Sequence, residues 1–187
     1  MAEERIRPLR RVEYEKMVEL GLFEDERIEL LAGLLVEMSP QGVPHAYAVQ
    51  QLTELLVTGL RRRAVLRPQL PIALSDDSEP DPDLVVSPAG DHANEHPAEA
   101  YSSAVAYLVI EVADSSLGKD RRVKGALYAS AGVPDYWIVN LTDRVIEVYR
   151  EPRPEGYASV ARAGRGETVA PLRFPDLVIR VDDIIPA

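Results

Sequence analysis

The sequence contains no cysteine, and none of its apolar runs is long enough to cross a membrane. The absence of cysteine excludes disulfides, thiolate zinc sites and a cysteine nucleophile, and it is typical of proteins in a reducing compartment. The longest uninterrupted apolar run covers residues 104–110, whereas a transmembrane helix needs about 20 residues. Residues 1–5 also lack the apolar centre of a signal peptide. We therefore predict a soluble cytoplasmic protein without a membrane segment.

Positive charge is scarce as well, because 31 acidic residues outnumber 21 basic residues and leave a formal net charge of -10. Tight nonspecific binding of nucleic acid needs many lysines and arginines that release counterions from the phosphate backbone, so the overall charge argues against it. The basic residues are nevertheless clustered in residues 61–67 and 119–124, and a divalent cation can offset local negative charge. The arginines of the first cluster either complement the negative end of a helix dipole or contact phosphate.

Length and apolar content predict one domain over residues 1–187, because 46% apolar residues are ample for a single core. Two short apolar runs around Gly33, residues 27–31 and 34–38, predict a β-hairpin. Apolar residues spaced three or four apart predict helices over residues 12–20, 45–63 and 119–130.

Four apolar segments predict the strands of a sheet, at residues 83–87, 105–112, 136–139 and 144–150. The second of them is apolar on both faces, as expected for the centre of a sheet that is covered on both sides. The order of strand, helix and strand predicts a right-handed parallel crossover. Prolines interrupt residues 66–74, which predicts an edge strand or an irregular path. Together these elements indicate an α/β fold with a mixed central β-sheet, flanked by helices and extended by β-hairpins.

Two acidic residues lie in or beside these apolar strands. Glu111 lies within the most hydrophobic strand, where an ionised carboxylate is costly unless it is paired, protonated or bound to a metal. Asp83 follows a proline and precedes an apolar run. Taken singly, Glu111 can be exposed by strand curvature or paired with an arginine, and Asp83 can be a turn residue like Asp81. Taken together on adjacent strands, the two carboxylates and a backbone carbonyl at Val112 can hold Mg²⁺ or Mn²⁺.

Three further residues complete the candidate site. Lys124, on the helix that follows the central strand, can position an attacking water or stabilise charge on a phosphate, whereas the alternative is a salt bridge with Asp120. Glu29 is a hairpin carboxylate. His45, at the start of the long helix, is a general base, a phosphate contact at the positive end of the helix dipole, or an ordinary capping residue. Tyr128 follows Lys124 by one turn and is placed to orient it.

Other residues with potential chemistry are predicted to have structural or solvent roles. His92 and His96 lie in a polar loop of residues 88–103, where the absence of a helical pattern favours solvated histidines over zinc ligands. Trp137 is predicted to lie in the core, because it is not part of an aromatic ladder of the kind that binds single strands.

With these residues the sequence resembles the Uma2 family, a member of the PD-(D/E)XK nuclease superfamily with a restriction endonuclease-like core. The resemblance implies that Asp83 is the aspartate of the Pro-Asp motif and that Glu111 is the acid of the second motif. It also supports Glu29 as a further acid. In the superfamily the lysine stands two residues after the second acid, a position that Ala113 holds here, and Lys124 takes its place as in other Uma2-like sequences. The resemblance covers most of the chain and rests on residues 27–40, 45, 79–86, 108–112, 120, 124, 128–129 and 131–139.

We therefore predict a metal-dependent endonuclease that hydrolyses nucleic acid, expected to be DNA, by direct in-line attack. Asp83 and Glu111 hold Mg²⁺ or Mn²⁺. Lys124 orients the water or the phosphate, and Glu29 and His45 assist. One alternative is a binding or scaffold protein that has kept the fold without turnover, which the net charge and the missing motif lysine favour. Another is a metallohydrolase of a small phosphorylated metabolite, because such a substrate needs only a local pocket.

The C-terminal residues predict a surface for self-association. Short apolar segments predict further strands at residues 157–161, 167–170 and 177–181. An apolar strand at the edge of a sheet can pair with a second copy of the same chain. We therefore predict a homodimer that forms through residues 177–185.

Overall fold

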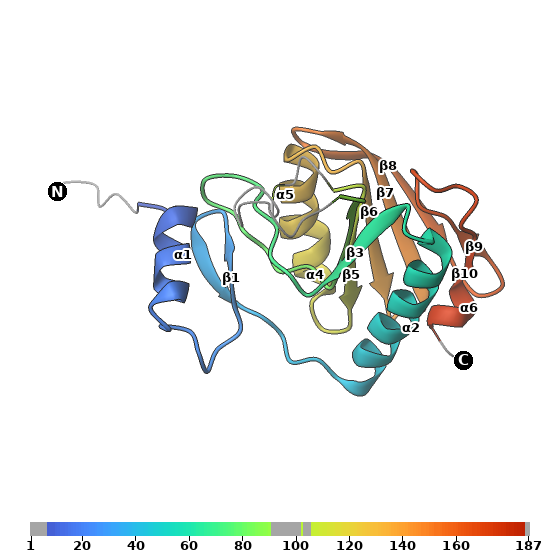
Figure 1. The fold of residues 1–187 in the computed structure, drawn as a ribbon, viewed down its shortest axis with the longest axis horizontal. Helices are drawn as coiled ribbons and strands as arrows, with labels where there is room; N and C mark the ends of the chain where they lie inside the picture. The colour runs from blue at the N-terminus through green and yellow to red at the C-terminus, as the bar shows by residue number, and fades with distance from the viewer. Residues whose placement is uncertain (1–6, 91–101, 103–105, 186–187) are drawn as a thin grey trace.

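The computed structural model describes residues 7–90, 102 and 106–185, which build a mixed central sheet (Figure 1). The sheet has six strands in the order β3-β4-β5-β6-β7-β8. Strands β5 and β6 run parallel, whereas the other neighbours run antiparallel. The predicted α/β class with a mixed central sheet is confirmed. The strands are β3 (Ala64–Pro68), β4 (Leu84–Pro88), β5 (Leu108–Ala113), β6 (Asp135–Asn140), β7 (Val145–Arg153) and β8 (Gly156–Ala163).

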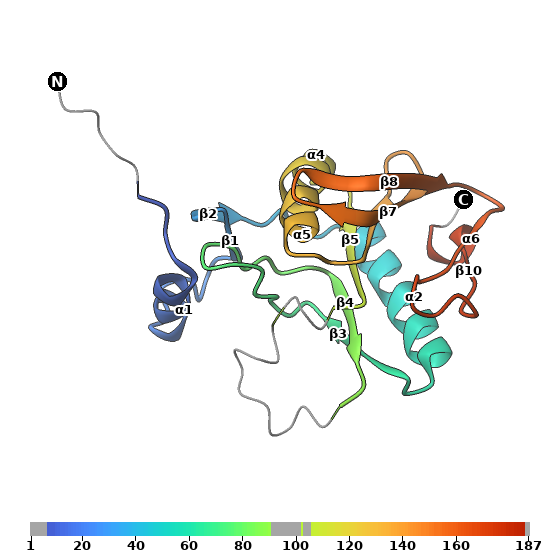
Figure 2. The same ribbon diagram turned by 90° about the horizontal axis from the view of Figure 1, so that it is seen from above.

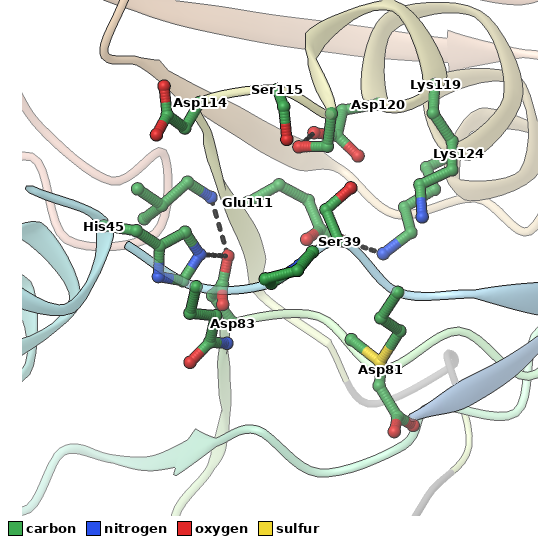
Figure 3. Close-up of a pocket in the computed structure, with 15 residues that line it drawn as sticks. Ser39, His45, Asp81, Asp83, Glu111, Asp114, Ser115, Lys119, Asp120 and Lys124 are labelled. Atoms are coloured by element: carbon green, nitrogen blue, oxygen red, sulfur yellow. Dashed lines mark hydrogen bonds and ion pairs between the residues drawn. The ribbon is translucent and has the colours of Figure 1, made fainter. Parts of the chain in front are cut away.

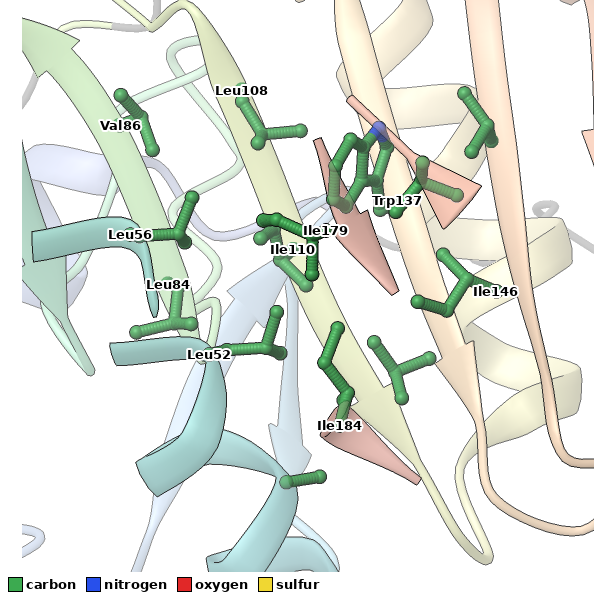
Figure 4. Packing of buried hydrophobic residues seen from close by; sticks show 14 of the residues in the cluster. Leu52, Leu56, Leu84, Val86, Leu108, Ile110, Trp137, Ile146, Ile179 and Ile184 are labelled. Atoms are coloured by element: carbon green, nitrogen blue, oxygen red, sulfur yellow. The ribbon is translucent and has the colours of Figure 1, made fainter. Parts of the chain in front are cut away.

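The long helix α2 (Val43–Leu60) covers one face of this sheet. Its Leu52 and Leu56 are fully buried and belong to the same apolar cluster as Ile110 of β5 and Trp137 of β6 (Figure 4). Trp137 therefore lies in the core, as predicted. Burying side chains of this size contributes about 1.5–3 kcal/mol each, so the packing of α2 on the sheet is a major part of the core.

The crossover from β5 to β6 covers the opposite face. It consists of α4 (Leu117–Lys119), the π-helical turn η3 (Asp120–Lys124) and α5 (Gly125–Ser130). Tyr128 of α5 is buried in a second apolar cluster with Val109 and Ile138. The predicted parallel crossover is thus present, but its helix begins at residue 117 and contains a π turn.

The N-terminal elements lie to one side of the sheet, as the two views in Figures 1 and 2 show. Leu30 forms an antiparallel bridge with Glu79, and the two residues exchange backbone hydrogen bonds of 3.3 and 2.8 Å. This bridge brings Glu29 beside the residues that precede β4. The predicted helix and hairpin correspond to α1 (Arg11–Glu19), β1 (Ile28–Leu31) and β2 (Leu34–Glu37).

The C-terminal residues differ from the prediction of an exposed apolar edge. They form the short strands β9 (Thr168–Val169) and β10 (Ile179–Arg180) and the helix α6 (Val181–Ile184), which lies beside α2 in Figures 1 and 2. Ile179, Val181, Ile184 and Ile185 are all buried, because they close the apolar cluster under α2. The edge predicted at residues 177–185 is therefore wrong, whereas self-association itself stays a prediction.

The interrupted segment after α2 is an edge strand, as predicted. Among the described residues β3 pairs with β4 alone and ends at Pro68, which has no backbone N–H to continue the ladder. The loop residues His92 and His96 lie outside the described residues. No helix in the described part of the chain is both long and apolar enough to span a bilayer.

Candidate active site

A small cavity lies where the N-terminus of α2, the strands β4 and β5 and the turn η3 meet (Figure 3). Its volume of about 40 Å³ has room for a few water-sized ligands. Residues 38–41, which follow the strand β2, also line it. Five of the six predicted site residues line this cavity, together with Asp81 and Lys119: they are His45, Asp83, Glu111, Val112 and Lys124.

Asp83 is fixed at the start of β4 by two contacts to one of its oxygens. Its Oδ2 accepts a hydrogen bond of 2.8 Å from the backbone N–H of Val112 and lies 3.2 Å from His45 Nε2. His45 is buried in the first turn of α2, and its Nδ1 has no hydrogen-bond partner in the described part of the chain. The structure thus makes His45 a direct neighbour of Asp83. Oδ1 of Asp83 carries no hydrogen bond to any described residue.

Glu111 lies in β5 and is held through its Oε1. The hydroxyl of Tyr128 donates to this oxygen at 2.7 Å, and Lys124 Nζ lies 2.9 Å from it. Burial raises the pKa of Glu111 to about 8, and the charge of Lys124 offsets this effect only in part. Tyr128 therefore contacts the acid rather than orienting the lysine. Oε2 of Glu111, like Oδ1 of Asp83, has no partner among the described residues.

Lys124 connects two buried carboxylates. Besides Glu111, its Nζ lies 2.8 Å from Oε2 of Glu29. Burial opposes the charged form of Lys124, but Glu111 and Glu29 together raise its pKa above the usual value. The alternative of a simple salt bridge with Asp120 is wrong, since Asp120 instead accepts a hydrogen bond of 2.5 Å from the hydroxyl of Ser116.

Glu29 is fully enclosed although it comes from the N-terminal hairpin. Its Oε1 lies 2.8 Å from Nζ of Lys119, and its Oε2 faces Lys124. Burial alone would raise the pKa of Glu29, but the two lysines outweigh this effect and lower it. The structure therefore brings Glu29 to the edge of the same site.

Lys119 and Asp81 are among the lining residues of this cavity that the sequence pattern does not reveal. In the sequence Lys119 is only one member of a basic cluster. An α-helix over this segment would place residues 119 and 124 on different faces, so it gives no reason to expect both lysines in one site. The sequence predicts a turn residue at Asp81. Burial, with the charge of Glu29, raises the pKa of Asp81 to about 6. The signal that could have revealed Asp81 is its spacing of two from Asp83, which points both side chains to one side of an extended segment.

The donor atoms fit a hard divalent cation held by few protein ligands. No group of three or more histidine, aspartate or glutamate side chains arranged for a metal occurs within residues 7–90 and 106–185. Asp83 and Glu111 nevertheless each offer one oxygen without a partner, and both line the cavity. Mg²⁺ is commonly bound through one or two carboxylates and keeps several waters. Two such oxygens beside a small cavity match that pattern.

Comparisons with known proteins agree with the fold. The model of the family Uma2, described as "Putative restriction endonuclease", matches residues 11–182. The chain is similar to a solved structure from Anabaena variabilis ATCC 29413, described as a putative nuclease belonging to DUF820. The TM-score is 0.71 at 16% sequence identity, and the match covers 95% of this chain and 97% of the other. No curated protein matches the chain.

Proposed function

Because this chain belongs to the Uma2 family, we propose that it is an endonuclease that hydrolyses nucleic-acid phosphodiester bonds with Mg²⁺ or Mn²⁺. One observation carries this proposal. Asp83 and Glu111 come from adjacent strands, face one cavity, and each keeps one carboxylate oxygen without a partner in the described chain. A metal-dependent nuclease can use such a pair to hold a cation beside the scissile phosphate.

Asp83 and Glu111 would hold the cation, and Val112 lines the cavity beside them. A divalent ion there offsets the charge of the scissile phosphate and lowers the pKa of water. Lys124 supplies a positive charge that keeps Glu111 and Glu29 in place. His45 orients Asp83 through a contact between Nε2 and Oδ2, and this leaves Oδ1 of Asp83 available for the cation. His45 and Lys124 thus preorganise the site, because both are buried and hold the carboxylates in place before the substrate binds.

The test compares D83N and E111Q with the wild-type protein on a supercoiled plasmid in Mg²⁺ and in Mn²⁺. Each variant should lose at least about a hundredfold in cleavage rate, because metal assistance supplies several kcal/mol. Calorimetric titration with Mn²⁺ should show binding to the wild type and weakened binding to both variants. D25N, which changes an exposed aspartate, is the control for loss of one charge. Cleavage at the wild-type rate by either site variant would contradict the proposal.

A scaffold protein that binds nucleic acid without turnover is the second candidate. The observation that favours it is the complete pairing of Lys124 between two carboxylates, in a chain whose motif position is Ala113. Mn²⁺ binding without cleavage of plasmid or single-stranded DNA would select it. Turnover of a phosphodiester monomer without cleavage of DNA would instead select a small phosphorylated substrate.

A further inference from the structure

The turn η3 places two lysines on one carboxylate. The backbone N–H of Gly125 bonds to the carbonyl of Asp120, which is the i→i+5 bond of a π turn. In an α-helix, residues five apart lie about 140° apart around the axis, because each residue rotates by about 100°. The π turn removes most of this offset, so Lys119 and Lys124 follow one another on the same side. Their Nζ atoms reach Oε1 and Oε2 of Glu29, each at 2.8 Å.

The two lysines differ in how firmly they are held. The Lys124 side chain is 3% exposed and lies between Glu29 and Glu111. The Lys119 side chain is 22% exposed and, among the described residues, pairs with Glu29 alone. Moving Lys124 would leave two buried carboxylates without their shared cation, which is strongly unfavourable. Moving Lys119 leaves Glu29 still paired with Lys124. Lys119 can therefore exchange its partner for an external anion at a lower cost than Lys124 can.

The side chains of Lys119 and Lys124 both extend toward the cavity in Figure 3, and both residues line it. Only three of the 21 basic residues of the chain are lysines, Lys16, Lys119 and Lys124. Two of these three are therefore in this site. A lysine ammonium is a compact charge on a flexible stem, whereas an arginine guanidinium forms a rigid two-pronged contact with a carboxylate. A cation that must leave one carboxylate for a phosphate is better supplied by lysine.

We propose that Lys119 is the cation that contacts a non-bridging oxygen of the substrate phosphate, and that Lys124 is a positioning residue that keeps Glu29 and Glu111 in place. In this arrangement Lys119 transfers from Glu29 Oε1 to the phosphate when nucleic acid enters. Lys124 then remains as the counter-charge of Glu29. This inference rests on the proposed function, because it names the phosphate contact of the same site.

The first test measures binding of a short DNA duplex in Ca²⁺, which replaces Mg²⁺ so that hydrolysis does not remove the ligand. K119Q should weaken binding roughly tenfold or more, because a hydrogen bond to a charged group is lost. K119R should recover part of this loss. K16Q removes an exposed lysine that pairs with Glu19 on α1, and it should bind as the wild type does. Mn²⁺ binding, followed by calorimetry, should persist in K119Q, since Asp83 and Glu111 are unchanged.

The second test uses the small number of lysines. Reductive methylation followed by mass spectrometry should modify Lys16 and Lys119 and leave the buried Lys124 unmodified. The DNA duplex in Ca²⁺ should then protect Lys119 but not Lys16. Wild-type binding by K119Q, or methylation of Lys119 that DNA does not reduce, would overturn the inference while plasmid cleavage still supports the nuclease. A wild-type protein that neither binds nor cleaves DNA would overturn both.

Discussion

The burial of Glu111 in the sheet is energetically unfavourable for its charged form, but it also fixes the orientation of the carboxylate. Glu111 lies among fully buried aliphatic neighbours in β5, and the cost of its charge in that environment raises its pKa to about 8. Lys124 and the Tyr128 hydroxyl both donate to Oε1, whereas Oε2 has no partner among the described residues and Glu111 lines the cavity. The contacts that stabilise the residue therefore also determine which oxygen is left for a ligand.

The Tyr128 contact can be tested at this scale. Y128F should reduce the free energy of unfolding by about 1–3 kcal/mol, because a buried acceptor loses a hydrogen bond. It should also weaken Mn²⁺ binding, since Glu111 loses its anchor. Y157F is the matched control, because the Tyr157 hydroxyl donates to the carbonyl of Val133 at 2.9 Å and not to a carboxylate of the cavity. Urea unfolding and calorimetry measure the two effects, and equal Mn²⁺ affinity in both variants would contradict the role of Tyr128.

At the scale of elements, the turn η3 is anchored to the sheet by a second buried carboxylate. Glu147 of β7 is fully enclosed and accepts hydrogen bonds from the guanidinium of Arg121, which belongs to η3. Tyr149 and Asn140 donate to it as well, at 2.7 and 3.2 Å. This cluster lies on the same face of the sheet as Tyr128. It ties the turn that carries the site lysine to a strand two positions away from β5.

The Glu147 cluster predicts a pH dependence of stability. Burial alone would raise the pKa of Glu147, but its hydrogen bonds from Arg121, Tyr149 and Asn140 lower it from 4.5 to about 2. A carboxyl whose pKa is lower in the folded state stabilises the fold above its unfolded pKa, and the contribution disappears as pH falls through the folded value. The wild type should therefore be more stable than E147Q at neutral pH, and the difference should shrink between pH 4.5 and 2.

Thermal unfolding of both proteins across this pH range measures the difference directly. E155Q changes an exposed glutamate in the turn between β7 and β8, and its stability should follow that of the wild type at every pH. A constant difference between wild type and E147Q down to pH 2 would show that the charge of Glu147 is not what stabilises the turn.

At the scale of the whole molecule, distant segments close around one sheet. The site takes residues from the N-terminal hairpin, the start of α2, the segment before β4, the strand β5 and the turn η3. The C-terminal helix α6 closes the opposite apolar cluster against α2 (Figures 1 and 4). Stability of the α2 face therefore depends on the last residues of the described chain, and α2 in turn carries His45.

The contribution of α6 is measured by shortening one of its buried side chains. I184A should reduce the free energy of unfolding by about 2–5 kcal/mol, because Ile184 is completely buried and its removal leaves a cavity. Val178 is 60% exposed, so V178A should change stability by no more than about 0.5 kcal/mol. Urea unfolding monitored by the fluorescence of the single tryptophan, Trp137, gives both values. A small loss in I184A would mean that α6 is not part of the cooperative core.

The elements that were predicted correctly have strong local patterns. The strand around Glu111, the helix that starts near His45 and the hairpin of Glu29 were indicated by apolar spacing and turn residues. The strands predicted at residues 157–161, 167–170 and 177–181 are present as β8, β9 and β10. The exposed edge predicted at residues 177–185 is wrong, because the four-residue helix α6 has no period long enough to recognise in the sequence. The sequence pattern does not reveal the turn η3, because residues 119–124 contain a single apolar residue, Val123, and apolar spacing cannot show the shift that an inserted residue causes.

The sequence by itself determined the α/β order of elements and the two acids that interrupt apolar strands, because periodicity and the cost of a buried charge are local properties. Tertiary structure alone decided the partners of those acids. Lys124 meets Glu29 across 95 positions of the chain, and Lys119 reaches the same carboxylate through a π turn. Pairing of this kind depends on how the hairpin bridges to Glu79 and how the crossover helix is wound. Spacing along the chain does not encode either arrangement.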